Sequence, residues 1–140
     1  MEHELNQLRL LAQTAGALAE LEPKDRRQWD SQAAAKMIAD LAGGLENLCR
    51  RRLRALSLQE PEGPDWHRMV LEDFLTVPDL GARLTPDLAH RLRKYLAFRH
   101  RFIHGYGFQV DWRMVEEPLR LLPETVEEIS KIWRDWLKSI

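Results

Sequence analysis

Apolar residues recur three and four positions apart along most of this chain, which is the spacing of helices that bury one face. The first stripe begins at Leu5 and ends before the Glu22-Pro23 step, because proline disfavours helical geometry in the residue before it. Its members are Leu5, Leu8, Leu11, Ala12, Ala15, Leu18 and Ala19. No segment of useful length alternates with the period of a β-strand. The pattern therefore predicts an all-α protein.

A second, longer helix is predicted to start between Lys24 and Ser31 and to continue to Leu53. Its core face consists of Ile38, Leu41, Leu45, Leu48 and Cys49. Gly43 and Gly44 lie inside this helix, and each glycine lowers helix stability by about 1 kcal/mol relative to alanine. Close approach of another helix, or a local kink, would account for them.

A short third helix is predicted after a proline-containing loop that runs from Ser57 to Pro64. Its buried face consists of Trp66, Val70, Phe74 and Val77. Pro78 is expected to stop it, because proline cannot continue the helical hydrogen bonding.

The fourth predicted helix begins with Thr85-Pro86-Asp87, which provides a capping hydroxyl, a proline in the first turn and an acid near the positive end of the helix dipole. It should end near Gly105 or Gly107. Its apolar stripe comprises Leu88, Leu92, Tyr95, Leu96, Phe102, Ile103 and Tyr106. Arg99 interrupts this stripe, and a guanidinium is costly to bury unless a partner compensates its charge. We expect that partner to be a phosphate group.

The C-terminal region is predicted to form two further helices. Asp111 would cap a short fifth helix from Trp112 to about Pro118, and a last helix would run from Pro123 to the end of the sequence. The inward face of the last helix consists of Val126, Ile129, Trp133, Trp136 and Ile140. Together the elements predict an up-and-down bundle of four or five helices, forming a single domain over residues 1–140.

Composition narrows the class of protein. With 44% hydrophobic and 31% charged residues, the 140-residue chain has the make-up of a globular domain. No apolar run approaches the roughly 18 residues of a membrane span, and the N-terminus lacks the features of a secretory signal. One cysteine, Cys49, excludes an intrachain disulfide and a multi-cysteine zinc site. We therefore expect a cytoplasmic protein of bacterial type without a membrane partner.

Charge is unevenly distributed although the net charge is only −1. Between Leu88 and Val110 there are five Lys or Arg residues and no carboxylate. A second basic cluster consists of Arg50, Arg51, Arg52 and Arg54. Local basic patches of this kind fit an acidic ligand, and they fit a solvated helix face equally well.

The candidate chemistry lies at the end of the fourth helix. Arg99 and His104 are five residues apart, about 140° around an ideal helix, so they are not a simple side-by-side pair. Either the last turn distorts toward Gly105, or the two residues line different walls of one cleft, which a symmetric dimer would supply. The alternative is structural: Arg99 extends its head to solvent and His104 lies on the surface.

Other readings of the same segment are weaker. His100 and His104 have the i, i+4 spacing of a helical metal site, but no carboxylate nearby completes it and basic neighbours would repel a cation. Tyr106 is either a core-edge residue or an exposed hydroxyl beside the cleft. No Gly-rich phosphate loop, Ser/His/Asp arrangement or paired-carboxylate motif is present. Phosphate chemistry based on arginine and histidine is the enzymatic hypothesis that is left, with no metal and no cofactor.

At these residues the chain resembles the HEPN superfamily, and within it the HepT-like ribonuclease toxins. Their signature is R-x4–6-H, which the HepT group sharpens to R-x4-H-x-Y, and Arg99, His104 and Tyr106 match the sharpened form. The flanking Tyr95-Leu96-Ala97-Phe98-Arg99-His100 and the Tyr106-Gly107-Phe108 that follows are also similar to this family. The resemblance covers most of the chain and implies an all-helical homodimer whose two motifs meet in a basic cleft.

The resemblance also implies an activity, namely metal-independent endonucleolytic cleavage of tRNA or mRNA. Arg99 would hold the phosphate, and His104 would act as general base or acid when a ribose 2′-hydroxyl attacks it. His100 and Arg101 would support RNA binding. Tyr106 matches the tyrosine to which a partner nucleotidyltransferase antitoxin transfers AMP in this family, and the added charge would repel RNA.

One position departs from the family pattern. Many HEPN ribonucleases carry a small polar residue directly after the arginine, where this chain has His100. His100 either substitutes as a hydrogen-bonding group or marks a member with reduced activity. The alternative function is therefore a non-catalytic helical module that docks a nucleotidyltransferase, and a purely structural helical dimer is a third possibility.

Overall fold

The structure, a computed structural model, describes residues 2–76, 84–104 and 110–139. Its elements are α1 (Glu2–Ala19), the 3-10 turn η1 (Pro23–Asp25), α2 (Asp30–Ala55), α3 (Trp66–Thr76), α5 (Pro86–His104) and α6 (Trp112–Ser139). The described part contains no strand, so the predicted all-α helical bundle is confirmed. Residues 77–83 and 105–109 lie outside the described part, and with them Val77, Pro78, Gly105 and Gly107 as predicted helix ends.

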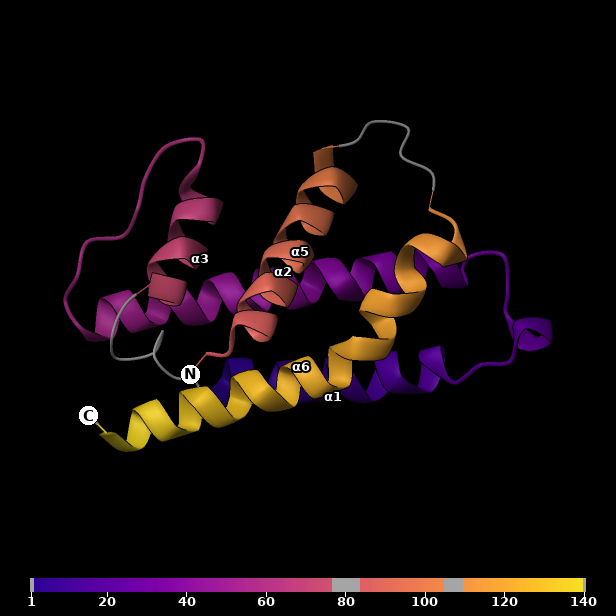
Figure 1. Cartoon of the computed structure of the whole chain (residues 1–140), viewed down its shortest axis with the longest axis horizontal. Coiled ribbons are helices and arrows are strands. Elements are labelled where there is room, and N and C mark those ends of the chain that lie inside the picture. Colours follow the sequence, from indigo (N-terminus) through magenta and orange to yellow (C-terminus); the bar gives the residue numbers. More distant parts are fainter. Residues whose placement is uncertain (1, 77–83, 105–109, 140) are drawn as a thin grey trace.

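The long helices α1, α2 and α6 lie lengthwise, and α3 and α5 cross α2 on one side of the molecule (Figure 1). α1 and α6 run side by side in opposite directions, and α2 contacts α1, α3, α5 and α6. Helix α2 is therefore the central element, and the two crossing helices are where the predicted site residues lie.

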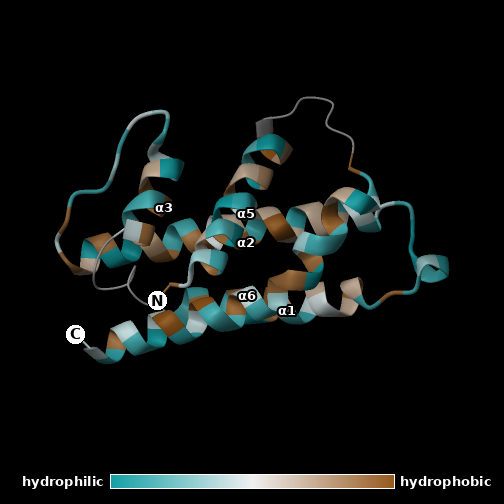
Figure 2. Cartoon of the chain, viewed as in Figure 1, coloured by the Kyte–Doolittle hydropathy of each residue, from teal (hydrophilic) through white to brown (hydrophobic). Residues whose placement is uncertain are grey.

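The core is one continuous apolar cluster to which every α-helix contributes. Its largest fully buried side chains include Trp133, Trp136 and Phe74, and the rings of Phe74 and Trp133 have centroids 4.6 Å apart. Each helix shows hydrophobic and hydrophilic residues along its length (Figure 2), as expected for helices with one buried face. Of the predicted inward residues in the last helix, Val126, Ile129, Trp133 and Trp136 are buried, and Ile140 lies outside the described residues.

Two predicted helix starts are confirmed by their hydrogen bonds. The Leu88 backbone N–H donates to the Thr85 hydroxyl at 3.1 Å, and the Met114 N–H donates to the Asp111 carboxylate at 3.3 Å. These side chains satisfy backbone donors that have no partner within a helix's first turn.

The prediction of two separate C-terminal helices is wrong. α6 is one helix from Trp112 to Ser139 with Pro118 and Pro123 inside it, and it bends in its first half (Figure 1). The prolines each remove one hydrogen-bond donor, but Val115, Leu119 and Leu122 are fully buried and carry the apolar stripe across both positions. Packing of this continuous stripe outweighs the local effect of the prolines.

The two glycines of α2 differ in their surroundings. A Cβ on Gly44 would lie 2.7 Å from Leu8 Cδ2, so the close approach of another helix, α1, accounts for this glycine. A Cβ on Gly43 would meet only Arg99 Nε, at 3.9 Å, which is ordinary contact. One of the two glycines thus serves helix packing, and the other borders the candidate site.

The apolar stripe of α5 is confirmed except at its end. Leu88, Leu92 and Tyr95 are buried, and Phe98, which the predicted stripe omitted, is buried as well. Ile103 is 53% exposed, because it lies at the edge of the buried face in the last turn of α5 and borders cavities instead of the core. Tyr106, the predicted last member of the stripe, lies outside the described residues.

Candidate functional site

Arg99 lies on the core-facing side of α5, as predicted, with only 24% of its side chain exposed. Its charge is compensated by a carboxylate: Arg99 Nη1 donates to Glu46 Oε1 at 3.0 Å and to Glu46 Oε2 at 3.1 Å. Glu46 projects from α2 and is 4% exposed. The protein itself therefore provides one counter-ion for Arg99, from its central helix, and the expectation that a phosphate also binds this guanidinium stays a prediction.

A histidine from α3 completes this polar cluster. His67 Nδ1 lies 2.9 Å from Glu46 Oε2 and 3.2 Å from Arg99 Nη1. The ring of Trp66 packs on that of His67 with centroids 3.6 Å apart, and Arg50 from α2 lies 4.8 Å from the Trp66 ring centre. Three helices thus each contribute one charged or titratable group to a cluster that the sequence did not predict as a unit.

Only one nitrogen of Arg99 is used in this cluster. A guanidinium carries five N–H donors, and within the described part of the chain the Nε and Nη2 donors of Arg99 have no hydrogen-bond partner. Arg99 also borders two hollows, a groove of about 910 Å³ between α1 and α2 and a cavity of about 680 Å³ between α3 and α5. Glu46 therefore anchors Arg99 while leaving donors available for an anion.

His100 and Arg101 are both exposed and line the α3–α5 cavity. Arg93, which also lines this cavity, bridges α5 to α3 through Glu72, with nitrogen–oxygen distances of 2.8 and 3.1 Å. That hydrogen bond holds the pKa of Glu72 below its ordinary value. The cavity wall on α5 is therefore basic, and the structure brings Arg99, His100 and Arg101 to one place.

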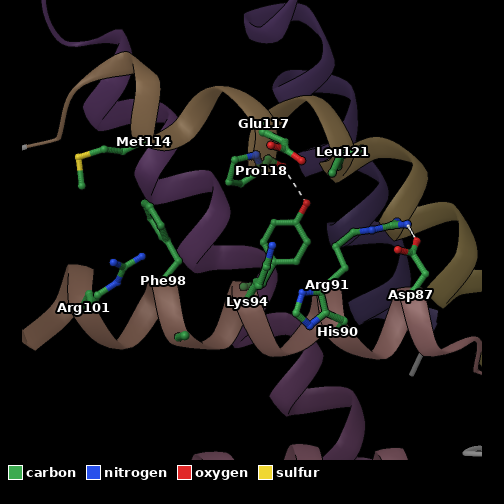
Figure 3. Close-up of a pocket in the computed structure, with 12 residues that line it drawn as sticks. Asp87, His90, Arg91, Lys94, Phe98, Arg101, Met114, Glu117, Pro118 and Leu121 are labelled. Atoms are coloured by element: carbon green, nitrogen blue, oxygen red, sulfur yellow. Dashed lines mark hydrogen bonds and ion pairs between the residues drawn. The ribbon is translucent and has the colours of Figure 1, made fainter.

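A third hollow, a pocket of about 370 Å³, lies between α5 and the first half of α6. Figure 3 shows Lys94, Phe98 and Arg101 from α5 facing Met114 and Pro118 of α6. Lys94 and Arg101 have no carboxylate within ion-pair distance among the described residues. Arg101 lines both this pocket and the α3–α5 cavity, so its charge is available at either.

The arginines of the second basic cluster, in contrast, are all paired with carboxylates. Arg50 and Arg54 bind Glu60 at 3.0 and 3.2 Å, Arg51 binds Glu4 at 2.6 Å, and the buried Arg52 binds Asp73 at 3.2 Å. The possibility that this cluster forms a footprint for an acidic ligand is not supported, because each of its four arginines is paired with a carboxylate.

The other two motif residues, His104 and Tyr106, lie partly or wholly outside the described residues. α5 is helical through His104, its last residue, but the His104 side chain lies outside the described part, as does all of Tyr106. The predicted meeting of Arg99 with His104, and the position of the Tyr106 hydroxyl, therefore stay predictions. Across the described residues, no group of three or more His, Cys, Asp or Glu side chains could hold a metal ion.

Sequence reasoning missed Glu46 and His67. Glu46 had a usable signal, because it occupies the same helical face as the buried Ala42, Cys49 and Leu53. His67 had none, since its neighbour Trp66 was predicted as a packing residue and nothing in the spacing relates α3 to α5.

The family model for HepT-like proteins matches residues 33–140, which includes the whole cluster and the R-x4-H-x-Y motif. The chain belongs to the HepT-like family. Members of this family are generally ribonuclease toxins of the HEPN type that act in toxin–antitoxin pairs. No curated protein and no solved structure matches the chain. Among the described helices, none is both long enough and apolar enough to cross a bilayer.

Proposed function

We propose that this HepT-like protein is a metal-independent endoribonuclease, the toxin of a toxin–antitoxin pair in the cytoplasm. One observation carries the proposal: Arg99 is anchored through a single nitrogen by the buried Glu46, and its other donors border a basic cavity. An anchored guanidinium with donors to spare can bind the non-bridging oxygens of a phosphodiester and stabilise the charge that develops on them.

In the proposed reaction, RNA contacts the C-terminal turns of α5, around Arg99, His100 and Arg101. Arg99 holds the scissile phosphate, His104 transfers a proton, and His100 and Arg101 contact flanking phosphates. The neighbouring ribose 2′-hydroxyl is the nucleophile, so the substrate is RNA, tRNA or mRNA, and not DNA. Two copies related by a two-fold axis would place two such motifs in one cleft.

The same proposal includes neutralisation by a nucleotidyltransferase antitoxin. Transfer of AMP to Tyr106, two residues after His104, would add a phosphate charge and a bulky group beside the cleft. The new charge would compete with RNA for Arg99 and Arg101. Co-expression with the nucleotidyltransferase should add AMP mass to the wild type but not to Tyr106→Phe.

The direct test is cleavage of total RNA by the purified protein, with and without a chelator. Wild type should cut in both conditions, and Arg99→Ala and His104→Ala should lose at least about 100-fold in rate. Wild-type rate with RNA in which the 2′-hydroxyl is replaced by hydrogen should be zero. Cleavage that requires a metal ion, or that persists in His104→Ala, would reject the proposal.

His100, in place of the small polar residue of many HEPN ribonucleases, supports one alternative: a non-catalytic module that docks a nucleotidyltransferase. This alternative expects a stable complex with that enzyme, no RNA cleavage and no toxicity on expression. Growth of a bacterial host expressing wild type or His104→Ala separates the two, because only a ribonuclease produces a growth defect that His104→Ala relieves.

A further inference from the structure

His67 is held in a geometry that the proposed reaction does not yet use. It lies in the first turn of α3, its side chain is 36% exposed, and it lines the α3–α5 cavity together with Arg99. Its Nδ1 points to the buried carboxylate of Glu46 at 2.9 Å. Among the residues that the structure describes, its other ring nitrogen, Nε2, has no hydrogen-bond partner.

The position of the imidazole proton follows from these contacts. Nδ1 lies near both a carboxylate oxygen, which can only accept, and Arg99 Nη1, which can only donate. The contact of Nδ1 with the Glu46 carboxylate is shorter than its contact with Arg99, and an anionic oxygen is the stronger hydrogen-bond acceptor. We therefore assign the imidazole proton to Nδ1, which donates it to Glu46. In the neutral ring this leaves the Nε2 lone pair unused. A carboxylate bound to one nitrogen of a histidine while the other accepts a proton is the arrangement of a general base.

The surroundings of His67 place that base beside the phosphate-binding group. Nδ1 lies 3.2 Å from Arg99 Nη1, and His67 and Arg99 both line the α3–α5 cavity, so a phosphodiester bound by Arg99 in this cavity would lie beside the imidazole ring. The charged groups in contact with the ring are Glu46 from α2 and Arg99 from α5, and Arg50 from α2 lies over the neighbouring Trp66 ring. The other charged or titratable groups that line the same cavity are Asp65, Arg68, Glu72, Arg93, His100 and Arg101.

We propose that His67 is a second catalytic histidine, the general base that removes the proton from the attacking ribose 2′-hydroxyl. This inference rests on the proposed ribonuclease function and assigns His104 the complementary role of general acid. His104 is the last residue of α5. The orientation of His67 by Glu46 also gives the buried carboxylate two tasks, since it anchors Arg99 as well.

The step balances without any further reactant. His67 Nε2 takes the 2′-hydroxyl proton, O2′ forms a bond to phosphorus, and the bond from phosphorus to the 5′ oxygen breaks. The leaving oxygen receives the proton of the His104 imidazolium. The products are a 2′,3′-cyclic phosphate and a 5′-hydroxyl end, and no group is oxidised or reduced.

The test compares kcat/KM for an RNA oligonucleotide across pH in wild type, His67→Asn, His67→Ala and His104→Ala. The amide of His67→Asn can still donate to Glu46 but has no atom in place of Nε2, so it preserves the fold and removes the base. His67→Asn should lose about 100-fold or more in kcat with little change in KM. It should also lose the fall in rate at acidic pH, and added imidazole should partly restore His67→Ala. His90→Ala, an exposed histidine of α5 away from the cluster, is the matched control and should be unchanged.

A substrate with sulfur in place of the 5′ leaving oxygen separates the two histidines, because a thiolate leaves without being protonated. This substrate should restore His104→Ala but not His67→Asn. If wild type cleaves RNA and His67→Asn keeps its rate and both limbs of the pH profile, the assignment of His67 is wrong while the ribonuclease function stands. If the sulfur substrate restores His67→Asn instead, His67 is not the base. If wild type cleaves no RNA, both proposals fail together.

Discussion

At the scale of single residues, the main finding is how the fold accommodates a charged group on an apolar face. Arg99 and Glu46 are 53 residues apart in sequence and form a two-oxygen contact beneath His67. Removing one member of such a pair leaves the other poorly solvated, which costs more than the pair itself contributes. Arg99 is partly exposed to solvent, which lowers the free-energy cost of leaving its charge unpaired when Glu46 is removed.

The strength of this pair is measurable by a double-mutant cycle with Glu46→Gln and Arg99→Met. We expect each single variant to lower the free energy of unfolding by about 2 kcal/mol and the double variant to lose less than their sum, with a coupling of about 1–2 kcal/mol. Urea denaturation of the four proteins gives the value. Additive losses would mean that the two side chains do not interact in solution.

Sequence alone identified one of the three members of this cluster. Arg99 was conspicuous because it breaks a stripe of known period, and the same test applied to α2 would have identified Glu46. The contact between them could not be predicted, because helical periodicity places a residue on a face but does not say which face of another helix it meets. His67 enters the cluster through the crossing of α3 over α2, which is a property of tertiary packing alone.

At the scale of elements, the paired glycines of α2 offer a matched comparison. Gly43→Ala should stabilise the protein by up to about 1 kcal/mol, because the new methyl group meets only Arg99 Nε at 3.9 Å and alanine favours the helix. Gly44→Ala should destabilise it, because its methyl group would overlap the buried Leu8 at 2.7 Å. Thermal unfolding of both variants checks the prediction, and shifts in the same direction would contradict the described packing of α1 on α2.

In helix α6, two prolines wrongly predicted a break between helices. Pro118 and Pro123 each indicate a boundary, yet α6 continues through both. A bond from α5 holds α6 near this point, since the Tyr95 hydroxyl donates to the Pro118 carbonyl at 2.7 Å. Such a bond between distant elements leaves no trace in either local sequence.

Tyr95→Phe should lower the free energy of unfolding by about 1 kcal/mol at neutral pH, because the Pro118 carbonyl loses this donor. Burial also raises the pKa of Tyr95 from 10.0 to about 12. A group with a raised pKa stabilises the fold below its unfolded-state pKa, and that contribution is lost as the pH rises through the folded-state value. The difference between wild type and Tyr95→Phe should therefore shrink from pH 10 to pH 12, which denaturant titration at several pH values would detect. A constant difference would show that folding does not raise the pKa of Tyr95.

At the scale of the whole molecule, folding pairs some basic side chains with carboxylates and leaves others unpaired, which the number of charged residues in each segment does not show. The arginines of α2 are all paired with carboxylates, whereas Lys94 and Arg101 on α5 have none nearby among the described residues. A protein with a net charge of −1 can therefore present one basic face to an anionic polymer.

Charge reversal at Arg101 should weaken RNA binding several-fold and reduce its dependence on salt, because a neutralised phosphate contact is lost. Lys138→Glu is the matched control. It makes the same change in net charge near the end of α6, away from the α5 face (Figure 1), and should leave affinity nearly unchanged. Titration of a labelled RNA at two salt concentrations measures both quantities. Equal losses in the two variants would indicate attraction by total charge without a defined surface.

The position of Cys49 has a practical consequence for all of these measurements. It is the single cysteine of the chain, it is 2% exposed, and burial raises the pKa of its thiol, so the native protein offers reagents almost no reactive sulfur. Alkylation should then proceed only when the core opens, and its rate should report how often that happens. Under native conditions Gly44→Ala should be labelled faster than wild type and Gly43→Ala more slowly. Labelling as fast as that of a small free thiol would mean that α2 is not packed as described.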